Sequence, residues 1–428
     1  MRVVRTSFVI FALMGLVPIG FVSVGNFTPF SIITTLIFIA SLPFAFKYVF
    51  SKDKIYSPPT KIMFMILLTV VISYIHMVLS IDKYSSWNIF RSLNYLLFFV
   101  MLAEIKNVDD INILFKRIGG FVVLMIATTI FFFYRPEILD GPLVSAGMGS
   151  FRGFEDGMVR IFTPGMMYTP LFFIFIVCAL IFGKIKSRLK PFFYILAFFA
   201  LFTTAIVNSV RTFAFGIIIS LIILAFYKLS LKRSIILFTV LSAIVLFSTT
   251  LLPAKYTEYV TKRVLPVASN LRNFDLNAGL NRTYAGDDEL GTFYWRLAEV
   301  PIVMEQMNTP YRILFGATGD LYNFDITDKV YAPHLAYLGI FFCFGLTGVV
   351  VFGIFIVYFS RKLVLLLKML KGNQYEYLAL FLLLAWINML IYGFFGGVFY
   401  DWSNEIFAII CALAVILEKL YSTKKLTY

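Results

Sequence analysis

The stretch that decides the fold is HLAYLGIFFCFGLTGVVVFGIFIVYF, residues 334–359, in which no lysine, arginine, aspartate or glutamate interrupts the apolar sequence. A helix of about 20 apolar residues crosses the hydrocarbon core of a bilayer. This segment is therefore long enough to span a membrane. It is followed at once by Arg361 and Lys362, and basic residues in such positions usually mark the cytoplasmic side.

The whole chain shares this composition. Of its 428 residues, 60% are hydrophobic and 14% are charged, whereas soluble domains carry roughly 45–50% and about 25%. The composition excludes a cytosolic enzyme, a disordered chain and a disulfide scaffold. The net charge of +14 does not indicate a nucleic-acid partner, because positive charge in a membrane protein usually marks cytoplasmic loops. Three cysteines lie inside apolar runs and predict neither disulfides nor a metal site: Cys178, Cys343 and Cys411.

The chain is expected to be an all-α polytopic membrane protein with about 12 transmembrane helices. The first span is interpreted as a transmembrane helix and not as a cleaved signal peptide, because no small-residue cleavage site follows it. The limit between the seventh and the eighth is the weakest. The twelve predicted spans are 6–24, 30–50, 61–81, 88–103, 113–134, 166–183, 191–209, 211–227, 234–252, 334–359, 376–395 and 402–418.

The basic residues predict the orientation. With the N-terminus in the cytoplasm, alternate loops on that side hold 23 of the 37 lysines and arginines, against six acidic residues. Each of these loops is short and basic, as the positive-inside rule requires. One missed span would reverse every later loop, so this regularity supports twelve spans with both termini in the cytoplasm.

Most of the polar sequence falls on the other side. An outer loop covers residues 135–165, and a larger one, 253–333, follows the ninth span. The domains are therefore predicted as 1–252 with spans one to nine, 253–333 as a periplasmic loop over a cavity, and 334–428 with spans ten to twelve.

The larger outer loop carries helical patterns. Tyr256 to Val267 repeats apolar residues at a spacing of three to four, and Trp295 to Met307 is a second amphipathic stretch, interrupted by Pro301. We expect short helices that lie on the membrane face, in a mostly helical cap.

Charged and histidine residues at the outer ends of spans are the functional candidates, since charge within a membrane is costly and often functional. The alternative interpretation is that the basic candidates are interfacial anchors and the acidic ones are helix caps. His76 is read as a packed polar residue, and two histidines do not predict a zinc site. The candidates are Arg91, Arg160, Arg211, His334, Asp401 and Glu405.

The sequence resembles the bacterial O-antigen ligase and O-antigen polymerase superfamily over about residues 150–355. Arg211 in Ser209–Val210–Arg211–Thr212 looks like the family's Ser-Arg element, and Arg160 with Pro164 looks like an earlier one. His334 followed by Gly345–Leu346–Thr347–Gly348 matches a His-x(10)-Gly-x-x-Gly pattern.

The large outer loop continues the resemblance. Trp295–Arg296–Leu297–Ala298–Glu299, then Pro310 and Phe315–Gly316–Ala317–Thr318–Gly319, is similar to the family's arginine, proline and glycine run. The departure is Leu335, where the family usually has Asn or another polar residue.

The resemblance implies a GT-C-like membrane glycosyltransferase that needs neither a metal nor a cofactor. It implies a donor glycan on undecaprenyl diphosphate and, as acceptor, a sugar hydroxyl of another lipid-linked glycan or of the lipid A core. The other implied partners are membrane lipids and a candidate chain-length regulator, with no nucleic acid. The expected location is the bacterial inner membrane, with the active site facing the periplasm.

The resemblance also implies roles for residues. Arg211 and Arg296 are expected to hold the departing diphosphate, and His334 to serve the acceptor or the leaving group. Guanidinium groups present planar donors that match phosphate oxygens. Further substrate contacts are predicted at Arg160, Arg91, Arg282 and Arg152, and reserve bases at Glu299 and Asp401.

Three functions stay open on the sequence. A polymerase is favoured because Leu335 breaks the ligase-like pair. An O-antigen ligase is the alternative. A lipid-linked oligosaccharide flippase or transporter is the alternative of another class, although the sequence has no acidic residue in mid-membrane for ion coupling.

Overall fold

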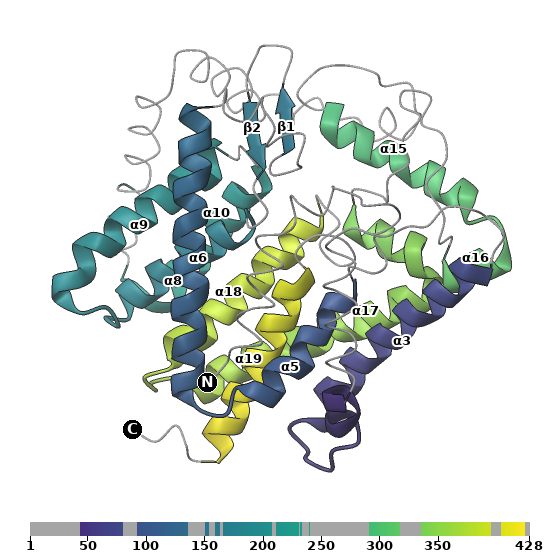
Figure 1. Ribbon diagram of the computed structural model, residues 1–428, viewed down its shortest axis with the longest axis horizontal. Coiled ribbons are helices and arrows are strands. Elements are labelled where there is room, and N and C mark those ends of the chain that lie inside the picture. The colour runs from purple at the N-terminus through teal and green to yellow at the C-terminus, as the bar shows by residue number, and fades with distance from the viewer. Residues whose placement is uncertain are drawn as a thin grey trace.

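The computed structural model is a bundle of apolar helices (Figure 1). The predicted helical class is confirmed. One antiparallel strand pair departs from it, formed by β1 (Ser150–Gly153) and β2 (Val159–Phe162); each strand has four residues, too few to show an alternating pattern. The structure describes residues 43–79, 92–135, 150–153, 159–162, 166–207, 211–230, 232, 239, 291–316, 335–394 and 404–423.

Within the described residues, four helical segments are long and apolar enough to cross a membrane, so the protein is a membrane protein by composition. They are α6 (Val108–Tyr134), Ser187–Ala205, α17 (Ala336–Met369) and α18 (Glu376–Gly393). The second of these joins η4 (Ser187–Leu189) and α9 (Lys190–Phe202) to the π-helical turn η5 (Thr203–Val207).

The structure describes several other helices. They are α3 (Ser57–Leu79), η2 (Ser92–Leu96), α5 (Leu97–Glu104), α8 (Tyr168–Ile181), α10 (Arg211–Lys228), α15 (Gly291–Gln306), α16 (Pro310–Phe315) and α19 (Asn404–Ser422). The predicted spans at 6–24 and 234–252, and most of 30–50, lie outside the described residues or nearly so, and the predicted total of twelve stays a prediction.

The core of the bundle is α19, in which every residue from Asn404 to Leu417 is buried. It lies beside α18 in the middle of the molecule, with α6 and α8 on one side and α3 and α5 on the other (Figure 1). Trp386 of α18 packs edge-on against Phe355 and Phe407, with ring centroids 5.4 and 5.2 Å apart. Such aromatic pairs contribute about 0.5–1.5 kcal/mol each beyond the area they bury.

Local sequence signals set where helices begin. Asn107 and Asp110 form a reciprocal capping box that starts α6, with bonds of 3.0 and 3.2 Å. Thr309 caps α16, and Pro310 occupies its first turn, where a missing N–H costs little. The predicted interruption at Pro301 does not occur, since α15 continues through it. Burial of Ile302 and Val303 beside the proline offsets the lost hydrogen bond.

Helix α17 is longer than the span predicted at 334–359. It continues to Met369 because Leu363, Leu366 and Leu367 stay buried against the bundle. Its backbone leaves helical geometry once, at Gly345, with φ 62° and ψ −160°. A positive φ is readily adopted by glycine but not by residues with a Cβ atom.

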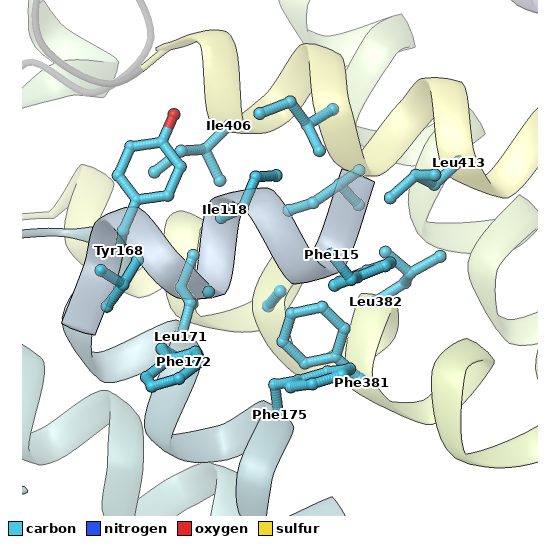
Figure 2. A pocket seen from close by; sticks show the side chains of 15 residues that line it. Phe115, Ile118, Tyr168, Leu171, Phe172, Phe175, Phe381, Leu382, Ile406 and Leu413 are labelled. Atoms are coloured by element: carbon cyan, nitrogen blue, oxygen red, sulfur yellow. The ribbon is translucent and has the colours of Figure 1, made fainter. Parts of the chain in front are cut away.

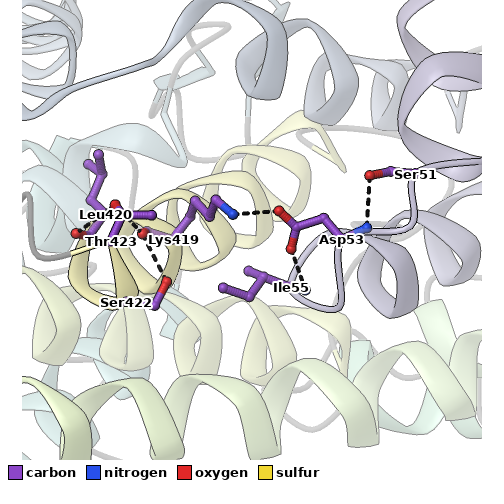
Figure 3. A network of polar contacts seen from close by, with 7 residues as sticks. All are labelled: Ser51, Asp53, Ile55, Lys419, Leu420, Ser422 and Thr423. Atoms are coloured by element: carbon purple, nitrogen blue, oxygen red, sulfur yellow. Dashed lines mark hydrogen bonds and ion pairs between the residues drawn. The ribbon is translucent and has the colours of Figure 1, made fainter.

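Ion pairs join several loops that the sequence assigns to the cytoplasm. Lys419 at the end of α19 pairs with Asp53 (Figure 3). Lys362 of α17 pairs with Glu418, and Lys228 of α10 lies 3.6 Å from Glu376 of α18. These charged positions therefore lie at one end of the bundle, and the predicted orientation stays a prediction. We call this end the basic end.

The carboxylate of Asp53 is held on two sides. It accepts hydrogen bonds from Lys419 and from the Ile55 backbone N–H, the latter at 3.0 Å, while its own backbone N–H donates to Ser51 (Figure 3). The hydrogen bond from Lys419, followed by the bond from Ile55, lowers the pKa of Asp53. The same hydrogen bond raises the pKa of Lys419.

Candidate functional site

The predicted site residues that the structure describes lie away from the basic end. Arg152 and Arg160 are cross-strand partners in the β1–β2 pair, which contacts α6 near the end opposite its cap (Figure 1). Arg211 is the first residue of α10. The candidates that lie outside the described residues are Arg91, Arg282, His334 and Asp401.

Residues near the starts of α10 and α17 contact the same end of α18. Near the start of α10, the Phe213 ring packs on Tyr392 with centroids 4.7 Å apart. Near the start of α17, the Tyr337 hydroxyl donates a 2.9 Å hydrogen bond to the Leu390 carbonyl. The helix that Arg211 opens and the helix that follows His334 therefore both begin beside the last turn of α18.

A buried polar cluster around Asn388 holds α10 against α18. The amide of Asn388 donates to Ser220 of α10 and, at 2.8 Å, to the Leu384 carbonyl, while its oxygen accepts from the Tyr392 hydroxyl at 3.1 Å. Gly216 lets the two helices approach closely, because a Cβ there would lie 3.0 Å from the Tyr392 ring. Buried hydrogen bonds of this kind fix the register of helices inside a membrane.

The start of α19 ties down the helices that follow two other candidate arginines. Asn404 accepts a 3.0 Å hydrogen bond from Asn94 of η2, three residues after Arg91. Glu405 accepts a 3.0 Å hydrogen bond from Tyr168, eight residues after Arg160. The sequence reading of Glu405 as an end cap missed this contact between helices. A buried glutamate beside a tyrosine of a distant span has no signature in spacing.

Helices α16 and α17 meet through two glycines that the sequence singled out. A Cβ on Gly316 would lie 2.6 Å from the Phe344 backbone nitrogen, and one on Gly345 would lie 2.5 Å from the nitrogen of Phe315. The Thr347 hydroxyl donates to the Leu314 carbonyl beside them. The backbone at the end of α16 and the backbone of α17 around Gly345 are thus in direct contact.

The remaining described candidates lie on α15. Arg296 and Glu299 occupy positions one turn apart on this helix, and the Glu299 side chain is buried. Helix α15 contacts α17 and lies toward α16, at the same end of the bundle as the strand pair but on its other side (Figure 1). The described contacts therefore join α10 and α17 to each other through α18, and join α15, which carries Arg296, to the bundle through α17.

An apolar cavity of about 70 Å³ lies between α6, α8, α18 and α19. Phe115, Phe175 and Phe381 line one part of it, and Tyr168 stands at another, with its ring against the cavity and its hydroxyl turned away (Figure 2). The hydroxyl is the one that meets Glu405. The cavity therefore ends where the polar contact between α8 and α19 begins.

Arginine side chains at one end of a bundle can hold a phosphorylated ligand, because one guanidinium group can donate two parallel hydrogen bonds to phosphate oxygens. Among the described residues, no three histidine, cysteine, aspartate or glutamate side chains are grouped to hold a metal ion. No known protein family and no curated protein matches this sequence.

Proposed function

We propose that the protein is a membrane glycosyltransferase that polymerises a surface polysaccharide of the O-antigen or capsule type. The donor is a glycan on undecaprenyl diphosphate, and the acceptor is a sugar hydroxyl of another lipid-linked repeat unit. The acceptor hydroxyl releases its proton as its oxygen bonds to the anomeric carbon, and the bond from that carbon to the diphosphate breaks, so that the diphosphate leaves as an anion with the bonding electron pair.

The chemistry of the candidate residues supports this reaction. A departing diphosphate needs its negative charge neutralised and does not need a proton. Preorganised cations in a partly desolvated site provide that stabilisation. Arg211 and Arg296, with Arg160, are assigned to the diphosphate. His334 is assigned to the acceptor hydroxyl or the leaving group, since an imidazole titrates near neutral pH.

The observation that carries the proposal is the shared end of α10, α17 and α18. Phe213, two residues after Arg211, and Tyr337, three residues after His334, contact the last turn of the same helix. A diphosphate and an acceptor hydroxyl must meet within a few ångströms, so the residues that serve them must lie on neighbouring elements. This end lies opposite the ion-paired basic end, which the proposal places in the cytoplasm.

An assay with purified protein tests the proposal. The full chain in nanodiscs is incubated with a defined repeat unit on undecaprenyl diphosphate, with and without a chelator, and chain growth is followed by gel. We expect growth in both conditions. Arg211→Ala should abolish growth and Arg211→Lys should restore part of it, while Arg188→Ala, at an exposed arginine of η4, should keep full activity. Full activity in both Arg211→Ala and His334→Ala would refute the assigned site.

The phenotype of a deletion strain separates the three functions. A polymerase predicts that single repeat units still reach the lipid A core. A ligase predicts free lipid-linked polymer with a bare core. A flippase predicts that lipid-linked units stay on the cytoplasmic side. Only the first pattern agrees with the proposed polymerase.

A further inference from the structure

The part of α17 that follows Gly345 is longer than a membrane crossing needs. After the backbone break at Gly345, α17 continues from Leu346 to Met369, which corresponds to about 36 Å of helix at 1.5 Å per residue. The hydrocarbon core of a bilayer is about 30 Å thick. Because this continuous helix is longer than the hydrocarbon core is thick, part of it extends past the hydrocarbon.

Contacts at the basic end mark where α17 leaves the hydrocarbon. Lys362 pairs with Glu418, and the neighbouring Lys419 pairs with Asp53. Tyr358, one turn earlier, lies below the Lys362 ammonium, which is 5.9 Å from its ring centroid. Tyrosine and charged pairs at one level are typical of the membrane–water boundary. The turns that follow Lys362 therefore lie at the depth of the lipid headgroups.

In these turns one face of α17 is buried and the other is open. Leu363, Leu366 and Leu367 are at most 8% exposed. On the opposite face Val364 and Leu365 are 40% and 47% exposed, and they lie between exposed Arg361 and Lys368. We call these four residues, Arg361, Val364, Leu365 and Lys368, the headgroup stripe; their spacing of three, four and seven places them on one helix face.

The charges of the stripe are not neutralised within the described part of the chain. Lys362, on the adjoining face, pairs with Glu418, whereas neither Arg361 nor Lys368 has an acidic partner among the described residues. Two cations therefore flank two apolar side chains at the surface of a membrane. This arrangement matches a phospholipid, with an anionic phosphate beside its acyl chains.

We propose that the headgroup stripe of α17 is a binding site for anionic phospholipid in the leaflet at the basic end. Arg361 and Lys368 hold the phosphate groups, and Val364 and Leu365 contact the upper part of the acyl chains. An acidic soluble protein would satisfy the two cations equally well. It would leave Val364 and Leu365 facing a polar surface, so lipid is the occupant that matches all four residues.

Lipid retention tests the site. The full chain is equilibrated in mixed micelles containing equal parts of phosphatidylglycerol and phosphatidylcholine, and the lipids that stay bound are identified by native mass spectrometry. The wild type should retain phosphatidylglycerol in preference. The double variant Arg361→Gln with Lys368→Gln should lower this preference about fivefold for each charge removed.

Two further variants make the result specific. Lys52→Gln with Lys54→Gln removes the same charge from an exposed loop at the same end and should keep the preference. Leu365→Gln should weaken retention of both lipids with the charges intact. Equal retention of the two lipids by the wild type would overturn the proposal, as would equal losses in the two double variants, since that would mean a diffuse attraction without a site.

Discussion

Tyr168 of α8 donates a 3.0 Å hydrogen bond to the carboxylate of Glu405 of α19, and both side chains are buried. The two residues are 237 positions apart in the chain. Their contact fixes the start of the helix that follows Arg160 against the most buried helix of the bundle. A carboxylate in an apolar environment depends on such a donor, because a buried polar group without a partner is costly.

The first prediction concerns this hydrogen bond. Tyr168→Phe removes the donor and leaves the buried carboxylate without it, which should lower the free energy of unfolding by about 1–3 kcal/mol. Glu405→Gln keeps an oxygen that can accept from Tyr168 and should cost less. Thermal unfolding of the purified variants in detergent measures both. A loss in Glu405→Gln larger than in Tyr168→Phe would contradict the assigned direction of the bond.

The second prediction concerns the contact between α16 and α17. Gly345→Ala places a Cβ at a positive φ and against the Phe315 backbone, so we expect a loss of more than about 2 kcal/mol in the free energy of unfolding. Gly353→Ala is the matched control, since no atom lies within 4 Å of a Cβ there. It should be neutral or stabilise the helix by up to about 1 kcal/mol. Similar losses in the two variants would rule out the close approach.

The third prediction concerns the paired arginines of the β1–β2 pair. Arg152 and Arg160 are directly opposite each other, and like charges in that position repel. Arg160→Glu should therefore stabilise the strand pair and, under the proposed function, abolish transfer from the diphosphate donor. Protease sensitivity of residues 150–162 and the chain-growth assay report the two effects. Retained transfer in Arg160→Glu would exclude Arg160 from diphosphate binding.

The fourth prediction concerns pH and the Asp53–Lys419 pair. Because the hydrogen bond from Lys419 lowers the pKa of Asp53, the pair stabilises the fold above the carboxyl's unfolded value of about 3.9. That stability is lost as the pH falls through the lowered folded value. Because the pKa of Lys419 is raised, its contribution is present below its unfolded value, about 10.4, and is lost as the pH rises through the folded value.

The size of this effect should be small. Both side chains are about one-third exposed, and exposed ion pairs contribute about 0–1 kcal/mol. Unfolding temperatures of the wild type and Asp53→Asn, compared between pH 3 and pH 7, measure it. The difference between the two proteins should be present at pH 7 and shrink toward pH 3. A difference that is the same at both pH values would assign the effect to packing.

The sequence predicted the helical class and the approximate positions of the long apolar helices that the structure describes, but not α16 or η5, and the orientation of the loops stays a prediction. The class and these positions depend on the length of apolar runs, and the orientation depends on the placement of lysine and arginine, both of which can be read along the chain. The end of α17 at Met369 was missed, because Leu363, Leu366 and Leu367 continue the buried face beyond the charged pair that ends the apolar run.

Contacts between helices could not be predicted in the same way. Periodicity indicates which face of a helix is apolar but not which helix covers it, so the pairs Asn94–Asn404 and Tyr168–Glu405 had no sequence signal. The glycines at 316 and 345 were singled out by resemblance, and only the structure places their backbones together. The roles of Arg211, Arg296 and His334 stay predictions.

The backbone contact between Gly316 and Gly345 closes a ring in the chain. The residues between these two points leave from one place on the bundle and return to it. The entropy of closing such a ring grows only slowly with its length. Variants with insertions, deletions or exchanged sequence at 317–333 should therefore fold around an unchanged frame. The two ends of this stretch are thus held together by α16 and α17, whatever its length or sequence.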